Sequence, residues 1–180
     1  MKWDDIDSQT CSIARTLSVV GDRWTLLIVR DAFLGTKRFD DFQKQLEISR
    51  HRLSDRLQKL VADGVLEKVP YQDNPPRFDY RLTEKGLGLF PILMMLAQWG
   101  NQWESDGNGD PVEYLHQTCG ATVPADLTCA SCGEALNPRD VIAVPGPGLL
   151  TALKDSIGLD EAAKDVRIPP MLRKAIADLS

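Results

Sequence analysis

The chain has 180 residues and a formal net charge of −5, and 43% of its residues are hydrophobic and 26% are charged. These values are typical of a globular protein with one ordinary domain and an appendage. The longest apolar stretch, Leu89–Ala97, is far shorter than the roughly 20 residues of a membrane span, and Met1–Asp5 lack the apolar core of a secretory signal. We therefore expect a cytoplasmic protein with reduced thiols and no membrane partner.

The charge is distributed unevenly along the chain. Residues 1–103 contain 15 Lys and Arg against 14 Asp and Glu, whereas residues 104–180 contain 6 against 12. Within residues 35–63, seven basic residues stand against five acidic ones. A local and modest basic footprint is thus predicted, and the overall charge neither favours nor excludes binding to DNA.

Three short helices are predicted before residue 47. Cys11–Val20 has apolar residues at a 3.6-residue period, and Gly21-Asp22 separates it from a second helix over Trp24–Leu34. Gly35 ends that helix, and the apolar spacing of Phe39–Leu46 predicts a third.

A fourth helix follows the break at Glu47-Ile48. Ser49 occupies an N-cap position, and Leu53, Leu57, Leu60 and Val61 form one apolar stripe. The opposite face is polar and basic, which is suited to a DNA major groove but is more often only a solvated surface. The neighbouring elements favour the first interpretation, because a short helix, a turn and a following hairpin form a specific arrangement. Asp55 could accept a hydrogen bond from a cytosine amino group, or pair with Arg52 or Lys59 on the same helix. Of the two, we expect the pair within the helix.

A β-hairpin is predicted after Gly64. Val65–Val69 and Arg77–Leu82 alternate in polarity, and the turn-rich segment Asp73–Pro76 lies between them. Arg77 near the tip is the candidate contact to phosphate or the minor groove, and the alternative is an ion pair with Asp73. Helix, turn, helix and hairpin together predict a winged helix-turn-helix.

A long helix is predicted from Thr83 to about Glu104, with a kink at Pro91. Its apolar residues cover more than one face, which indicates a dimer interface with the first helix as a further component. The alternative is that the C-terminal part of the same chain covers the second face.

The acidic C-terminal part contains a Cys/His pattern. After a linker over residues 105–111, His116, Cys119, Cys129 and Cys132 follow the spacing H-x2-C-x9-C-x2-C. One His and three Cys form a complete tetrahedral ligand set for structural zinc. Two alternatives remain: a redox pair at Cys129 and Cys132, or a metal-free hairpin. Short helices are predicted over Leu149–Ile157 and Pro170–Leu179.

The sequence resembles HxlR-type regulators of the MarR-like superfamily over about residues 10–104. The resemblance rests on six segments: Cys11–Arg15, Gly21–Ile28, Arg38–Phe42, Leu53–Leu57, Asp63–Leu66 and Tyr80–Gly86. It implies a homodimeric winged helix-turn-helix regulator that binds palindromic operators. The segment Arg50-His51-Arg52 is more basic than the Pro-Lys-Val type often found there, so the operator sequence is not predicted. The C-terminal Cys/His extension also resembles that of some such regulators.

Cys11 lies where some relatives carry a sensor thiol. A position beside a helix start and Arg15 favours thiolate formation, whereas most lone Cys residues are small buried hydrophobes. Both interpretations of Cys11 stay open at this stage.

The predicted fold is mainly α with a small β wing (α+β), followed by a small β-rich Cys/His module. The predicted domains are residues 1–106 for DNA binding and dimerisation, 107–148 for the Cys/His module and 149–180 for a helical tail. The predicted DNA-binding residues are Lys37, Arg38, Ser49, Arg50, His51, Arg52, Ser54, Arg56, Lys59 and Arg77.

The predicted function is a dimeric repressor that binds a pseudo-palindromic operator in double-stranded DNA and responds to a thiol signal or a small-molecule effector. The alternative is a protein-interaction module that uses the long helix and a zinc knuckle. A thiol-disulfide oxidoreductase ranks third, and we expect no enzymatic activity because no catalytic triad is evident.

Overall fold

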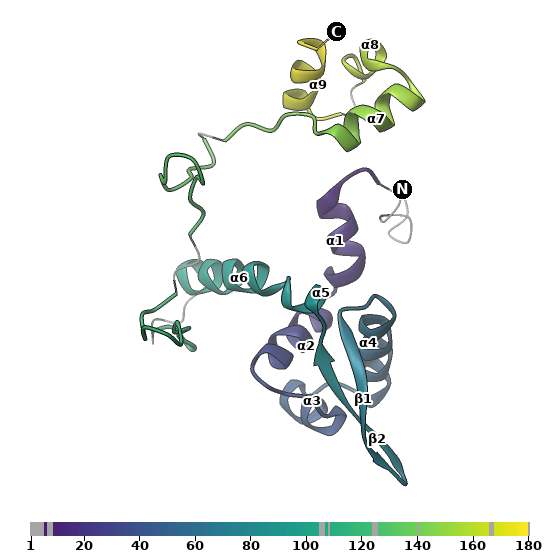
Figure 1. Cartoon of the computed structure of the whole chain (residues 1–180), viewed down its shortest axis with the longest axis vertical. Coiled ribbons are helices and arrows are strands. Elements are labelled where there is room, and N and C mark those ends of the chain that lie inside the picture. Colours follow the sequence, from purple (N-terminus) through teal and green to yellow (C-terminus); the bar gives the residue numbers. More distant parts are fainter. Residues whose placement is uncertain are drawn as a thin grey trace. The chain divides into compact units, whose positions relative to one another are not determined.

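The computed structural model of the chain describes residues 6, 9–104, 107, 109–123, 126–139, 141–165 and 168–179. These residues group into two compact units, Arg15–Ala125 and a second unit of Met1–Ala14 with Asp126–Ser180. The elements are α1 (Ser12–Val20), α2 (Arg23–Phe33), α3 (Phe39–Leu46), α4 (Arg50–Ala62), β1 (Leu66–Asp73), β2 (Pro76–Leu82), α5 (Glu84–Leu87), α6 (Phe90–Trp103), α7 (Pro147–Ser156), α8 (Leu159–Ala162) and α9 (Pro170–Ala177) (Figure 1). No helix in the described ranges is long and apolar enough to cross a membrane.

The starts of α2 and α4 are each fixed by a short polar side chain. The Asp22 carboxylate accepts hydrogen bonds from the backbone N–H groups of Trp24 (3.0 Å) and Thr25 (3.2 Å) at the start of α2. The Ser49 hydroxyl accepts from the Arg52 N–H at 3.5 Å, which confirms Ser49 as the N-cap of α4. Between α3 and α4, Glu47 takes a left-handed conformation with φ of 50°, so the chain turns within a few residues. These caps satisfy backbone donors that a helix end otherwise leaves unpaired.

The apolar stripe of α4 enters the main core. Leu53, Leu57 and Leu60 are fully buried, as the helical period predicts. The buried core residues of this cluster are Ile28, Val29, Phe42, Leu46, Ile48, Leu53, Leu57, Leu60, Val65 and Leu66. Because α2, α3, α4 and the hairpin all contribute to it, the core holds α4 and the hairpin in one rigid piece.

The hairpin is antiparallel, with a register that runs from Leu66 opposite Leu82 to Asp73 opposite Pro76. Figure 1 shows it projecting beyond α3 and α4. At its base, the Thr83 hydroxyl donates to the Gly64 carbonyl at 2.6 Å. A further pairing was not predicted: the Tyr80 N–H donates to the Lys37 carbonyl at 2.7 Å, and Arg38 forms a β-bridge with Asp79. The segment before α3 is thereby fixed along the outer edge of β2.

The prediction of one long helix from Thr83 to Glu104 is wrong, because the chain forms α5 and α6 with a break at Gly88-Leu89. Pro91 lies in the first turn of α6, where its missing N–H group has no helical partner to lose. Pro91 therefore begins a helix instead of kinking one. Thr83 caps α5 by accepting from the Gly86 N–H at 3.1 Å.

The Cys/His segment has little regular structure. The expected β-rich character is limited, within residues 109–123 and 126–139, to two isolated bridges, Leu115 with Thr122 and Thr128 with Ala135. After it, α7, α8 and α9 pack around Leu153, Ala162 and Ile176. The short helix α8 was not predicted; it follows Gly158, whose φ of 77° allows the reversal after α7.

Candidate nucleic-acid interface

The outward face of α4 carries side chains that are free of the core. Arg50, His51, Arg52 and Lys59 are exposed, and Ser54 is half-buried at the flank. Among the described residues no carboxylate forms an ion pair with Arg52, whereas Ser54 accepts a hydrogen bond from the Gln58 side chain at 3.4 Å. Arg52 is therefore the α4 cation with the fewest internal competitors for DNA.

The predicted partner of Asp55 is wrong. Its carboxylate lies 3.6 Å from the His51 Nδ1, while the Lys59 ammonium lies 2.9 Å from the Asp63 carboxylate at the end of the helix. Both are i, i+4 pairs. Lys59 is also four residues from Asp55, but its ammonium pairs with Asp63 instead. Asp55 thus pairs with His51 and forms no ion pair with Arg52 in the described part of the chain.

Arg56 occupies a different environment from the other predicted contacts. Its Nε lies 3.2 Å from the Asp22 carboxylate, and both side chains are about two-thirds buried. This ion pair joins α4 to the N-terminus of α2. Arg56 is therefore paired with Asp22 and partly exposed, whereas Arg50, Arg52 and Lys59 are fully on the exposed face of α4.

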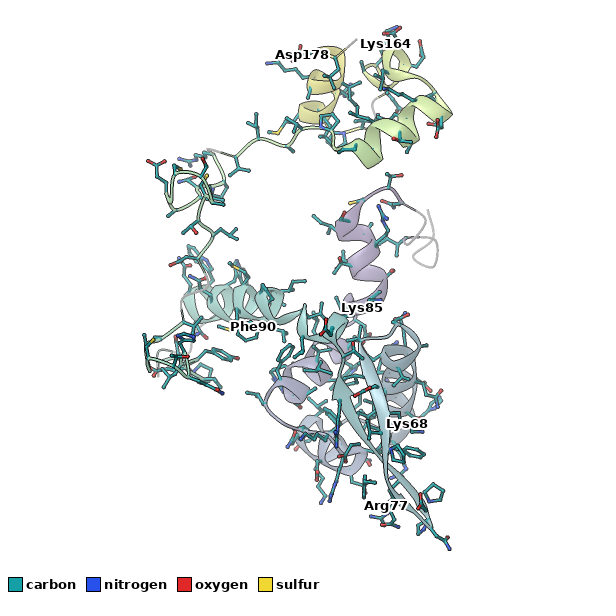
Figure 2. All side chains as sticks on the ribbon, viewed as in Figure 1. Lys68, Arg77, Lys85, Phe90, Lys164 and Asp178 are labelled. Atoms are coloured by element: carbon teal, nitrogen blue, oxygen red, sulfur yellow. The ribbon has the colours of Figure 1, made fainter. Side chains whose placement is uncertain are left out.

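A groove of about 470 Å³ lies between the start of α3, the start of α4 and the wing. Five cations line it: Arg38, Lys44, Arg50, Lys68 and Arg77. Asp40 and Asp41 also line it, so the groove is net basic. Figure 2 shows Lys68 on the hairpin and Arg77 towards its tip. A basic groove beside an exposed recognition helix fits a nucleic-acid backbone.

Aromatic rings position three of these cations. The Arg38 guanidinium lies 4.7 Å from the Tyr71 ring centroid, Arg50 lies 4.8 Å from that of Phe39, and the Lys68 ammonium lies 4.0 Å from that of Phe78. Ring contacts of this kind hold a cation while leaving its outer surface available to an anion. Two of them also form ion pairs, Arg38 with Asp79 at 3.9 Å and Arg50 with Asp40 at 3.6 Å.

Lys44 and Lys68 line the groove but were not predicted as DNA-binding residues. Alternation along β1 does not mark Lys68, which lies two residues from the buried Leu66, and the position of Lys44 depends on how α3 packs. Among the described residues Arg77 and Asp73 form no ion pair, so Arg77 is exposed at the tip without that competitor. Lys37 is exposed at the adjoining edge of β2.

The predicted metal ligands lie in two similar turns. In the first, the His116 Nδ1 and the Cys119 Sγ are 3.3 Å apart, and Gly120 follows with φ of 71°. In the second, backbone N–H groups of Cys132 and Ser131 and the Cys132 thiol hold the pKa of the Cys129 thiol below its ordinary value, and Gly133 has φ of 75°. Within the described residues, no cluster of three or more His, Cys, Asp or Glu side chains is positioned to hold a metal.

Cys11 is exposed immediately before α1. The interpretation of Cys11 as a buried hydrophobe is therefore wrong for this chain. The helix starts at Ser12, so the thiol lies beside its first turn as predicted.

Large apolar side chains remain exposed on α1, α5 and α6. The exposed residues are Ile13, Leu17, Leu87, Phe90, Ile92, Leu96, Trp99 and Trp103, and their exposed fractions range from 39% for Leu17 and Ile92 to 72% for Ile13. Exposure of so many large apolar side chains is unusual for a monomer.

The recognition helix, the hairpin wing and the basic groove define a DNA-binding transcriptional regulator of the winged helix-turn-helix class. Residues 19–108 match the model of the HxlR-like helix-turn-helix family. An uncharacterised HTH-type transcriptional regulator of Mycobacterium tuberculosis strain H37Rv is 43% identical over 145 residues, which are 81% of this chain and 92% of that protein. The chain belongs to the HxlR-like helix-turn-helix family.

Solved structures agree with this assignment. The crystal structure of PA1607, described as a candidate transcription factor, is 38% identical with a TM-score of 0.69, and the match covers 76% of this chain and 96% of that one. A second candidate transcription factor, PA1374 from Pseudomonas aeruginosa, is 36% identical with a TM-score of 0.55 over 76% and 93% of the two chains.

Proposed function

We propose that this regulator is a homodimeric repressor that reads a pseudo-palindromic operator through α4 and acts in the cytoplasm. One observation carries the proposal: Arg52 on α4 is exposed beside the basic groove, and no carboxylate of the described residues pairs with it. Arg52, His51 and Ser54 would face base edges, and Ser49 at the N-terminus of α4 would face a phosphate. Lys37, Arg38, Arg50, Lys59 and Arg77 would follow the phosphate backbone, with Lys44 and Lys68 as additions from the groove.

Selection of bound sequences from random DNA duplexes tests this proposal. A two-fold dimer should enrich inverted repeats with half-sites about 10–10.5 base pairs apart, or a multiple of that spacing. Binding should weaken steeply as salt is raised, since each neutralised phosphate releases counterions. Enrichment of a single unrepeated motif would contradict the dimeric operator, and retention independent of salt would contradict the groove as a phosphate site.

The homodimer is proposed from the apolar surface of α1 and α6. Trp99 and Trp103 are exposed by 57% and 64%, and a second copy would bury them. Light scattering of the Leu96→Glu variant should give a monomer where the natural chain gives a dimer. The matched control is Leu127→Glu, whose parent side chain is exposed by 62% outside these helices and should leave the dimer intact.

The same apolar surface favours one alternative, a module that docks a different protein through α6. The two functions differ in their response to DNA. A protein-docking module would not be retained on duplex DNA in a salt-dependent way, whereas the repressor would be.

We also propose that the C-terminal extension is a structural zinc module with His116, Cys119, Cys129 and Cys132 as ligands. Support comes from the spacing and from the two similar turns. In each turn, a glycine with positive φ directly follows the second of the two ligands. The donor types fit zinc, because one imidazole and three thiolates complete a tetrahedral set. Zinc would fasten two turns that otherwise rely on a few backbone hydrogen bonds.

Cys11 is proposed as a redox-sensing thiol, supported by its exposure before α1. Alkylation of Cys11 should change operator affinity, and the Cys11→Ser variant should lose that response. Unchanged affinity after complete alkylation would remove the sensing role.

A further inference from the structure

A pocket lies within the unit Arg15–Ala125, where the end of α2 meets the end of α6 and residues 109–114. Its volume is about 720 Å³, within the ~300–1,000 Å³ of ordinary small-molecule sites. The DNA-binding face does not use this pocket, since the groove beside the wing is lined by other residues.

Asp31 gives this pocket its chemical character. The residue is 4% exposed in the last turn of α2, a position where the helix dipole disfavours a carboxylate. Arg30 donates twice to a single oxygen, since its Nε and Nη2 lie 2.8 Å and 2.7 Å from Oδ1. The other oxygen, Oδ2, is buried and has no hydrogen-bond partner in the described part of the chain. A buried carboxylate oxygen without a donor is costly, so this site is suited to a ligand that supplies one.

The other side chains that line the pocket favour a positively charged ligand. Glu104 and Asp110 also line the pocket, so three carboxylates stand against Arg30, which is already bound to Asp31. Leu34 and Val112 provide apolar contacts. A positively charged donor with an apolar body therefore matches the lining better than an anion does.

Gly100 on α6 lies beside the open space of the pocket. A Cβ atom added at Gly100 would meet no heavy atom within 4 Å, and the residue lines the pocket. Glycine within a helix is less stable than alanine, so packing does not explain its presence here.

We propose that this pocket binds an organic cation with an apolar body, whose N–H group donates a hydrogen bond to the Asp31 Oδ2. The ligand would bridge α2, which packs against α3, α4 and β2, and α6, which carries the exposed apolar surface. An occupant at this junction would alter the orientation of α6 and hence the spacing of the two recognition helices. This regulatory consequence rests on the proposed dimeric repressor, whereas the binding itself does not.

Titration calorimetry with dibenzylammonium tests the binding, with diphenylacetate as an anion of similar size. The natural chain should bind the cation and not the anion. Asp31→Asn should lower affinity at least tenfold, and the control Asp160→Asn, which removes one exposed acid of α8, should not change it. No binding of the cation, equal binding of both probes, or full binding by Asp31→Asn would overturn the proposal.

A second pair of variants tests whether the cation occupies this pocket, without changing any charge. Gly100→Leu should fill the pocket and abolish binding, whereas Gly100→Ala should keep it and raise the thermal midpoint. Both variants remain informative if Asp31→Asn fails to fold, because neither alters the carboxylate. Undiminished binding by Gly100→Leu would place the cation elsewhere and overturn the site.

Operator affinity measured in parallel separates this inference from the proposed function. Without the cation, Asp31→Asn and Gly100→Leu should bind the selected operator as the natural chain does. Adding dibenzylammonium should change the operator affinity of the natural chain at least threefold and leave both variants unaffected. If the natural chain binds no duplex, the proposed repressor fails while calorimetry still decides the pocket; if it binds both DNA and cation without mutual effect, the regulatory coupling is wrong.

Discussion

The winged-helix segment and the Cys/His segment differ in what holds them together. Between Arg23 and Leu82, ten buried apolar side chains from α2, α3, α4 and the wing form one core. Between residues 109 and 146, by contrast, no described side chain is buried. The first segment has burial as its source of stability, and the second does not.

The Cys/His segment has backbone hydrogen bonds in place of a buried core. Val123 donates to the Tyr114 carbonyl at 2.8 Å, and Leu136 donates to the Leu127 carbonyl at 2.8 Å. Hydrogen bonds exposed to water stabilise little on their own, because water competes for both partners. The contrast indicates that the first segment folds by itself, whereas the second needs a cross-link, for which zinc is the proposed agent.

The largest expected effect comes from removing a proposed zinc ligand. Cys132→Ser should reduce bound zinc from one equivalent to less than a tenth, because structural zinc sites need all four ligands and contribute on the order of 10 kcal/mol. Metal analysis of protein purified without chelator or metal-affinity resin measures this. The exposed Cys11→Ser serves as the control and should retain the full equivalent.

Limited proteolysis of the same proteins sharpens the comparison. Cleavage in residues 109–139 should become much faster in Cys132→Ser, while the winged-helix segment stays resistant. A natural chain that carries no zinc and yet resists cleavage there would refute the zinc module.

The next largest effect concerns the core. Phe42→Ala should cost ~3–5 kcal/mol of unfolding free energy, because it removes a large aromatic side chain from a packed site. Phe42 is fully buried. Urea unfolding followed by circular dichroism measures the loss.

The matched control lies in the other segment. Leu127 is 62% exposed, so Leu127→Ala should change stability by less than about 0.5 kcal/mol. Equal losses of unfolding free energy at the two positions would mean that the Cys/His segment has a core of its own. The proposed difference between the two segments would then be wrong.

A smaller effect is expected for DNA binding. Arg52→Gln should weaken operator binding by about 1–3 kcal/mol and relax specificity at one base position, as loss of a base-edge contact does. Titration of a labelled operator at fixed salt measures it. Arg139→Gln removes an exposed arginine of the Cys/His segment and should leave affinity unchanged; a loss as large as that of Arg52→Gln would place DNA contacts outside the winged helix.

Local patterns in the sequence were sufficient to predict most of the winged helix. The stripe of Leu53, Leu57 and Leu60, the cap at Ser49 and the alternation in the hairpin each depend on residues a few positions apart. The exposed face of α4 followed directly, because a helix with one buried stripe must expose the other side.

Contacts between distant segments were not predicted. The pairing of Lys37 with Tyr80, the ion pair of Arg56 with Asp22 and the inclusion of Lys44 in the groove all depend on how elements pack. No local pattern marks Asp31 as a buried carboxylate either, since an acidic residue in an amphipathic helix is ordinarily exposed. The break before α6 was missed because Pro91 was interpreted as a kink instead of a first-turn residue.

The smallest effect expected is at Ser49, where stability and recognition can be separated. Ser49→Ala removes the hydroxyl that accepts from the Arg52 N–H at 3.5 Å, and it should cost about 0.5–1 kcal/mol of unfolding free energy. Ser49→Asp keeps an acceptor at the cap, so urea unfolding should show no loss of stability. Its negative charge would repel the phosphate proposed at the start of α4, and operator binding should fall more than in Ser49→Ala. If Ser49→Asp binds the operator as well as the natural chain does, no phosphate lies at this helix start, and Ser49 serves only the fold.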